Sequence, residues 1–234
     1  PAELPAVRLF MMGRNSWQDE DEWPPARSQP MQLFLHSEGL ANSLSGDGSL
    51  RLDRPIDEPE DVFVYDPGLP VPSLGGNSCC VPEFSPMGAY DQRIIEARND
   101  VLVYTSDFLN SPVEVIGEIQ IQLFVTSSAN STDFTAKLVD VFPDGRAINI
   151  VDSIVRIEST SNEVIGIVQP IGVTANVFQT GHRIRLEVSS SNFPTYERSL
   201  NSVDAKDLFS SQVALQRVFH SHDRASSLTL PTVT

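Results

Sequence analysis

The chain has 234 residues, and its 31 acidic side chains outnumber the 16 basic ones, which gives a formal net charge of −15. This charge excludes most proteins that bind nucleic acid or anionic membranes, because both partners require clustered Lys and Arg. No apolar stretch approaches the ~18 residues of a membrane-spanning helix, so we expect a soluble protein. The length suits one domain with a sizeable core, and 17 Pro and 13 Gly favour turns over long helices.

The first half of the chain contains three predicted strands, over residues 7–12, 31–36 and 61–65. Each is a short apolar or alternating run. Between the first two, Trp17 and Trp23 flank four acidic residues, and a Pro pair that follows them ends any helix. We therefore expect this segment to interrupt the strand pattern.

Residues 67–92 form a long irregular segment, and the β pattern becomes dense after residue 100. Alternating runs predict strands over residues 101–104, 113–116, 118–125, 135–142, 147–155, 182–188, 212–220 and 227–230. The run 182–188 alternates as a half-buried strand does, and one short helix is expected near residues 204–209. About ten strands and little helix predict an all-β fold, a jelly-roll β-sandwich (galactose-binding-domain-like) in which residues 1–234 form a single domain.

The sequence contains no G-x-S-x-G elbow, the turn that exposes a catalytic serine in many hydrolases. The run Ser189-Ser-Ser191 lacks this elbow, so we interpret its hydroxyls as ties between a strand end and neighbouring loops, with Phe193 packed inward. His182 follows a tight turn and is interpreted as a structural histidine bonded to its loop. We therefore predict no catalytic residue in this chain.

Two groups of residues suggest a metal, and in both a simpler interpretation is preferred. His220 and His222 lie two apart, which on a strand places them on one face, but no further ligand pattern accompanies them and a surface pair is favoured. Asp47, Asp53, Asp57 and Asp61 surround one loop without the spacing of an EF-hand, so a solvated face is favoured over a calcium site. We predict no metal and no cofactor.

Eight motifs are spread over nearly the whole chain. They are Val7-Arg-Leu-Phe, Tyr65-Asp-Pro, Ser73-Leu-Gly-Gly76, Asp91-Gln-Arg93, Asp133-Phe-Thr-Ala-Lys-Leu-Val-Asp-Val, Pro143-Asp-Gly-Arg-Ala-Ile, Gly181-His-Arg-Ile and Val188-Ser-Ser-Ser-Asn-Phe-Pro. In sequence and in order they closely resemble the C-terminal domain of the cocaine esterase and X-Pro dipeptidyl-peptidase family, which includes glutaryl cephalosporin acylases and α-amino acid ester hydrolases. One departure is the segment 157–174, which is shorter than usual in the family. Either a hairpin is shortened here or residues are missing.

The resemblance implies that this sandwich follows an α/β-hydrolase domain that carries the whole Ser-His-Asp triad. No position here inherits a catalytic role, and the chain alone should be inactive. The chain begins with Pro rather than Met and shows no signal peptide, so we expect a piece of a longer polypeptide. The implied partners are the α/β-hydrolase catalytic domain of the same polypeptide and a small ester or amide substrate, cleaved through an acyl-enzyme. A homodimer is left open.

The resemblance also implies that the loop after Ser73-Leu-Gly-Gly76 approaches the active-site mouth, so Cys79 and Cys80 are predicted to line the substrate pocket; simple loop packing is the alternative. Adjacent cysteines close only a strained ring, and two free thiols favour a reducing, cytoplasmic compartment. Trp17 and Trp23 are predicted to form an interdomain contact, and a stacking shelf for a sugar is the alternative.

A different class of function, a free-standing carbohydrate- or ligand-binding β-sandwich module, also suits the predicted fold. The surface distinguishes the two. A domain separated from its partner exposes apolar side chains around residues 7–12, Trp17 and residues 79–82, whereas a lectin has a polar groove with one or two exposed aromatic rings.

Overall fold

The computed structural model describes residues 4–77, 82–158, 160, 162–203 and 208–233. Its elements are β1 (Val7–Met11), β2 (Ser16–Glu20), β3 (Ser28–His36), β4 (Ser49–Arg51), β5 (Asp61–Tyr65), α1 (Arg93–Glu96), β6 (Leu102–Thr105), β7 (Val113–Ser127), β8 (Ser131–Val141), β9 (Ala147–Glu158), β10 (Ile165–Phe178), β11 (Arg183–Ser189), η1 (Leu208–Ser210), β12 (Ala214–Val218), β13 (His220–Ser221), β14 (Arg224–Ala225) and β15 (Ser227–Val233). Neither helix within these ranges is long enough to cross a membrane.

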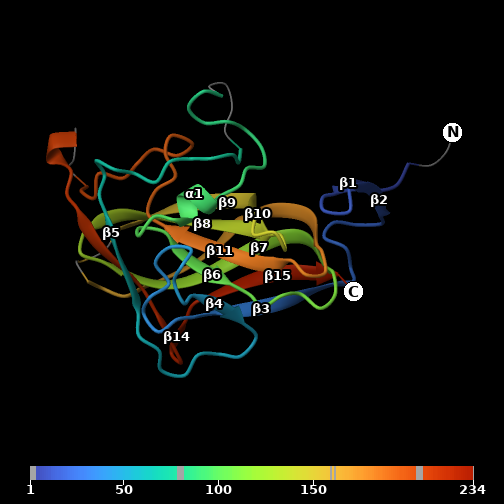
Figure 1. Ribbon diagram of the computed structural model, residues 1–234, viewed down its shortest axis with the longest axis horizontal. Coiled ribbons are helices and arrows are strands. Elements are labelled where there is room, and N and C mark those ends of the chain that lie inside the picture. Colours follow the sequence, from blue (N-terminus) through green and yellow to red (C-terminus); the bar gives the residue numbers. More distant parts are fainter. Residues whose placement is uncertain (1–3, 78–81, 159, 161, 204–207, 234) are drawn as a thin grey trace.

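Eleven strands form one sheet with the order β5-β12-β7-β15-β3-β4-β6-β11-β8-β9, and β10 pairs with β7 beside this path. The sheet folds over on itself around one apolar core (Figure 1). That core joins Leu123 and Leu228 from one half of the strand order to Leu138 and Leu186 from the other. Burial of these side chains from water drives the two layers together. The predicted all-β sandwich is confirmed, and its strands are more numerous than expected because several span only two to five residues.

Strands β7 and β10 differ from the prediction because of glycine and proline residues within them. The runs predicted over 113–116 and 118–125 form the single strand β7, which continues through Gly117 at φ +141°, a conformation that glycine tolerates. Strand β10 was not predicted as such, yet it pairs along the whole of β7. Its alternation is interrupted by Pro170 and Gly172, and the register shifts between these two residues.

The hairpin of β1 and β2 projects from one end of the sandwich (Figure 1). The expected interruption after residue 12 was wrong in part, since Trp17 belongs to β2. Met11 anchors the hairpin and is buried against Ile116 and Val177. At the turn, Gly13 has φ +77°, and a Cβ there would lie 2.1 Å from the carbonyl oxygen of Val177. The hairpin therefore reaches the sandwich closely only because glycine occupies this position.

The outer face of β8, β11 and the first half of β9 carries polar side chains, yet it is buried. A cover layer, which we define as residues 67–97 with α1 and residues 190–196, lies over it (Figure 1). All eleven residues of β8 are buried, because the apolar core lies on one side and the cover layer on the other. For the same reason the prediction of a half-buried strand over 182–188 was wrong, since β11 is buried on both faces.

Candidate functional site

Two ion pairs lie between the cover layer and the sheet. Arg185 of β11 donates from Nη1 to Glu96 Oε2 of α1 at 2.7 Å and from Nε to Thr105 Oγ1 at 2.8 Å. Lys137 of β8 lies 3.3 Å from Glu187 Oε2. All four charged side chains are at least nine-tenths buried. A buried charge is tolerated only when it is paired. The Arg185–Glu96 pair therefore joins the cover layer to the sheet, and the Lys137–Glu187 pair links the neighbouring strands β8 and β11 beneath that layer.

The carboxyl group of Glu187 has an unusual proton affinity. Its burial is the largest cause and raises its pKa to about 7. The ammonium group of Lys137 opposes this rise, and the negative charge of Glu96 adds to it. Glu187 therefore changes its charge near neutral pH inside the molecule.

Between Gly76 and Gly88 the described residues, Asn77 and 82–87, form a loop that projects above the cover layer (Figure 1). At its base these two glycines exchange backbone hydrogen bonds of 2.7 and 3.0 Å. In its described part, Phe84 and Met87 are 76% and 69% exposed. Exposed large apolar side chains on a projecting loop are typical of a surface that contacts a partner.

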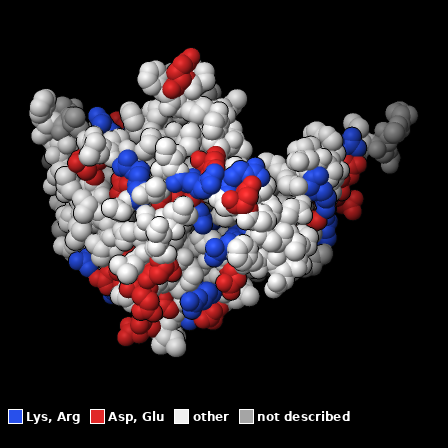
Figure 2. All heavy atoms as spheres, viewed as in Figure 1, with Lys and Arg blue, Asp and Glu red and all other residues white. Residues whose placement is uncertain are grey.

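Two of the four predicted site residues, Trp17 and Trp23, belong to the described part of the chain. The other two, Cys79 and Cys80, lie outside the described residues. Trp17 and Trp23 are 68% and 41% exposed, and the ring of Trp17 contacts that of Phe10 edge-on at 5.4 Å. Figure 2 shows a hollow in the outline between the β1–β2 hairpin, which carries Trp17, and the body of the sandwich. The two tryptophans are therefore accessible to a partner beside the sandwich.

The histidines have structural environments. His182 Nδ1 lies 2.8 Å from Asp140 Oδ1, and its ring packs against Phe142, which agrees with the structural role proposed from sequence. The expectation of a surface pair at His220 and His222 was wrong for His220, which is fully buried. Its Nε2 lies 3.1 Å from Asp61 Oδ2, close enough for electrostatic attraction although the geometry does not suit a hydrogen bond.

The four aspartates considered for calcium do not converge. Asp61 accepts hydrogen bonds from Ser37, Tyr104 and the backbone of Ala41 at 2.7 to 2.8 Å, so protein donors occupy its lone pairs. Asp47 shares the Ser37 hydroxyl at 2.9 Å. Figure 2 shows acidic side chains gathered at the lower end of the molecule, where Figure 1 places the loop between β4 and β5. Across the described ranges, no group of three or more acidic, His or Cys side chains is arranged to hold a metal ion.

The serine run at the end of β11 ties loops together, as predicted. Ser191 Oγ accepts the Val71 N–H at 2.8 Å, and Ser190 Oγ accepts from Gln216 Nε2 at 3.0 Å. The prediction that Phe193 packs inward was wrong, because this side chain is 40% exposed beneath the Arg198 guanidinium. The hydroxyls of Ser190 and Ser191 thus hold a side chain and a backbone group, whereas the buried Ser189 Oγ has no hydrogen-bonding partner among the described residues. In this described part of the chain, no hydrogen bond places a histidine beside any of the three, as an activated serine would require.

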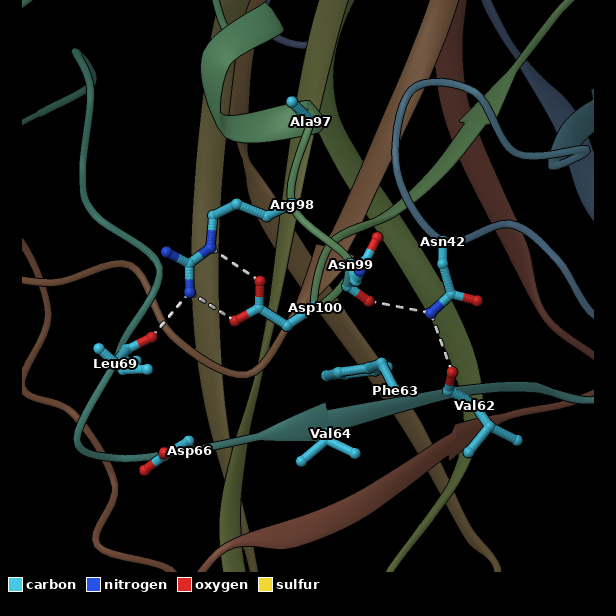
Figure 3. Close-up of a pocket in the computed structure, with 10 residues that line it drawn as sticks. All are labelled: Asn42, Val62, Phe63, Val64, Asp66, Leu69, Ala97, Arg98, Asn99 and Asp100. Atoms are coloured by element: carbon cyan, nitrogen blue, oxygen red, sulfur yellow. Dashed lines mark hydrogen bonds and ion pairs between the residues drawn. The ribbon is translucent and has the colours of Figure 1, made fainter.

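A groove of about 580 Å³ runs along the free edge of β5 (Figure 3). The Asn42 amide bridges its two sides by donating to Val62 O at 2.9 Å and Asn99 O at 3.0 Å. The one aromatic residue in its lining, Phe63, is only 2% exposed. A sugar ring would find no aromatic surface to stack on here, so this groove does not support the alternative of a carbohydrate-binding module.

Comparisons with known proteins agree on the family. The model of the X-Pro dipeptidyl-peptidase C-terminal non-catalytic domain matches residues 2–229. The chain is 42% identical to cocaine esterase from Rhodococcus sp., over 99% of this chain and 42% of the esterase. It superposes on a solved α-amino acid ester hydrolase with a TM-score of 0.85, and on a solved aminopeptidase from a marine sediment Thaumarchaeota archaeon with a TM-score of 0.84. Identity to each is 25%, over 99% of this chain and 41% of that protein.

The chain thus spans less than half the length of these relatives. Its serines tie loops and its buried histidines face carboxylates, which suits a domain that performs no chemistry. The chain belongs to the family of X-Pro dipeptidyl-peptidase C-terminal non-catalytic domains.

Proposed function

We propose that residues 1–234 form the C-terminal domain of a larger serine esterase or amidase and pack against its α/β-hydrolase domain. The parent enzyme hydrolyses a small ester or amide through an acyl-enzyme, with its triad in the hydrolase domain. The main support is the exposure of large apolar side chains on the two elements that project from the sandwich, namely Phe10 and Trp17 on the hairpin and Phe84 and Met87 on the loop. An esterase and an ester hydrolase among the longer relatives agree with this reaction class.

Within this proposal, Cys79 and Cys80 line the acyl side of the substrate pocket, and Trp17 and Trp23 contact the hydrolase domain. The loop that carries the cysteines starts from a fixed base at Gly76 and Gly88, which supports a role in shaping a neighbouring site. Adjacent cysteines, which we expect to be free thiols, suit a reducing compartment, so we place the enzyme in the cytoplasm.

The proposal is tested by hydrolysis of p-nitrophenyl acetate and butyrate by the purified chain, alone and mixed with its own upstream hydrolase domain. We expect no turnover by the chain alone, because it offers no activated nucleophile. We expect the mixture to hydrolyse faster, or with a different acyl preference, than the hydrolase domain alone. Turnover by the chain alone that a serine-directed phosphonate blocks would contradict the proposal.

The interdomain contact is tested by Trp17→Ser in two proteins. In the isolated chain we expect a loss of at most about 1.5 kcal/mol in the free energy of unfolding, because Trp17 is 68% exposed and loses mainly its contact with Phe10. In the full-length enzyme we expect a larger loss, of about 2 kcal/mol or more, as for a tryptophan buried at an interface. Urea denaturation measures both.

A control for this test is Leu52→Ser, since Leu52 is 70% exposed and lies on the groove beside β4 rather than on the hairpin. It should have the same small effect in both proteins. Equal losses for Trp17→Ser in the chain and in the full-length enzyme would show that Trp17 makes no interdomain contact.

A further inference from the structure

The base of the projecting loop is held by side chains as well as by the backbone hydrogen bonds between Gly76 and Gly88. Gly75 and Gly76 have φ +81° and +88°, and a Cβ at either position would lie less than 3.0 Å from Gly88 O or Asp152 Oδ2. The two glycines therefore let the loop backbone descend onto β9. Beneath them lie two buried amide side chains, Gln92 of the cover layer and Asn149 of β9, which are 0% and 5% exposed.

Asn149 holds the side of the loop that returns to α1. Its Oδ1 accepts the Tyr90 N–H at 2.7 Å, and its Nδ2 donates to Gly88 O at 3.2 Å. Its backbone N–H also donates to Tyr90 O at 3.3 Å. Three hydrogen bonds from one residue thus fix the last residues of the loop to the sheet.

Gln92 connects the two sides of the loop to each other. Its Nε2 donates to Leu74 O at 2.8 Å, before the loop, and to Tyr90 O at 3.0 Å, after it. Its Oε1 accepts from Lys137 Nζ at 2.8 Å, and Lys137 is in turn paired with Glu187. The same Nε2 lies 3.3 Å from Asn149 Oδ1, so the two amides form one connected unit, which we call the amide clamp.

We propose that the amide clamp of Gln92 and Asn149 positions the projecting loop and thereby sets the acyl preference of the parent enzyme, an inference that rests on the proposed function of this loop. Neither residue reaches the substrate, and both act through the loop backbone. The clamp is rigid because its amides are buried and because their donors and acceptors meet partners on both sides of the loop. Loss of one amide donor leaves a loop carbonyl without its partner, which frees the base of the loop.

The test uses the full-length enzyme that contains this chain, with the isosteric substitutions Asn149→Asp and Gln92→Glu. Each replaces an N–H₂ group by an oxygen that repels the loop carbonyls, while the shape of the side chain is kept. The matched control is Asn42→Asp, since Asn42 also donates its amide to two backbone carbonyls, Val62 O and Asn99 O, on a different loop. Thermal unfolding identifies any variant that fails to fold, in which case Asn149→Ala replaces it.

Two quantities are measured. The first is hydrogen exchange at the amides of Gly76 and Gly88, which bond each other's carbonyl groups across the base of the loop. We expect it to accelerate roughly tenfold or more in the clamp variants and not in the control, because the base opens more easily without the amide donors. The second is the ratio of kcat/KM for p-nitrophenyl acetate to that for p-nitrophenyl butyrate. We expect this ratio to change at least about threefold in the clamp variants and to stay constant in the control.

A further pair of variants, Cys79→Phe and Cys80→Phe, separates failure of the inference from failure of the proposed function. If these change the acyl ratio but the clamp variants do not, the loop lines the pocket and the clamp inference is overturned. If neither set changes the ratio, the proposed role of the loop fails and the inference fails with it. Unchanged exchange at Gly76 and Gly88 also overturns the inference, whatever the activity.

Discussion

Arg185→Leu is expected to lower the free energy of unfolding of the chain by about 3–5 kcal/mol, because it leaves the fully buried carboxylate of Glu96 without a counter-charge. No second cation takes the place of Arg185 among the hydrogen bonds that Glu96 makes, and Glu96 Oε1 already lacks a hydrogen-bonding partner in the part of the chain that the structure describes. The loss also removes the bond from Arg185 Nε to Thr105. Urea denaturation of the purified chain, at constant pH, measures the change.

Two variants test whether the uncompensated charge causes this loss. The double variant Glu96→Leu with Arg185→Leu should recover most of the stability, since apolar residues of similar volume often replace a buried ion pair at little cost. The matched surface pair is Arg8 with Asp19, whose side chains are 54% and 50% exposed. Arg8→Leu should leave the stability nearly unchanged, because water solvates and screens this exposed pair. A double variant as unstable as Arg185→Leu would instead assign the loss to packing.

The second large expected effect is a change of the free energy of unfolding with pH, and it arises from the carboxyl group of Glu187. The folded state raises the pKa of this carboxyl from 4.5 to about 7, so between these values the folded chain binds a proton that the unfolded chain has released. The stabilisation from the neutral carboxyl is therefore complete below about pH 4.5 and is lost as the pH rises to about 7. The loss is on the order of 3 kcal/mol for a shift of this size. The charged groups that face this carboxyl are Lys137 and Arg185, which lower its pKa, and Glu96, which raises it.

Glu187→Gln isolates this contribution, because the amide stays neutral at every pH. We expect the variant to gain stability relative to the unaltered chain as the pH rises from 4.5 to 7, while other titrating groups cancel in the difference. Glu118→Gln, at an exposed carboxyl on β7, is the control and should give a difference independent of pH. A difference for Glu187→Gln that is flat over this range would show that Glu187 is already ionised in the folded chain.

The strands of the apolar core could be predicted from sequence, because alternating apolar and polar residues indicate a strand with one face packed against the core. β5 has the bounds predicted for it, and β8 and β9 cover their predicted ranges with small shifts. β10 could not be predicted in this way, since Gly166, Pro170 and Gly172 break its pattern and only the long partner β7 holds it extended. Local sequence carries no sign of such a partner.

The cover layer could not be predicted from local sequence patterns either. Lys137 and Glu187 alternate with apolar residues as if they faced water, and they are buried only because residues 67–97 fold over them from elsewhere in the chain. The amide clamp has the same origin, since Gln92 and Asn149 bind backbone groups that any sequence supplies. The one available signal was the Gly75–Gly76 pair, which marks a backbone that comes close to another. Trp17 and Trp23 are exposed in this chain, and the interdomain contact predicted for them stays a prediction.

The position of β15 in the sheet has a consequence for how the protein is made on the ribosome. β15 lies between β7 and β3, so its residues 227–233 pair with strands that begin near residues 113 and 28. Until β15 leaves the ribosome, both β3 and β7 have an unpaired edge in the middle of the future sheet. Contacts of such sequence separation form late and slowly, and unpaired apolar edges invite aggregation. Nascent chains are therefore most in need of chaperones just before β15 emerges, and a stop codon that removes β15 would leave an incomplete, aggregation-prone sheet rather than a slightly shorter domain.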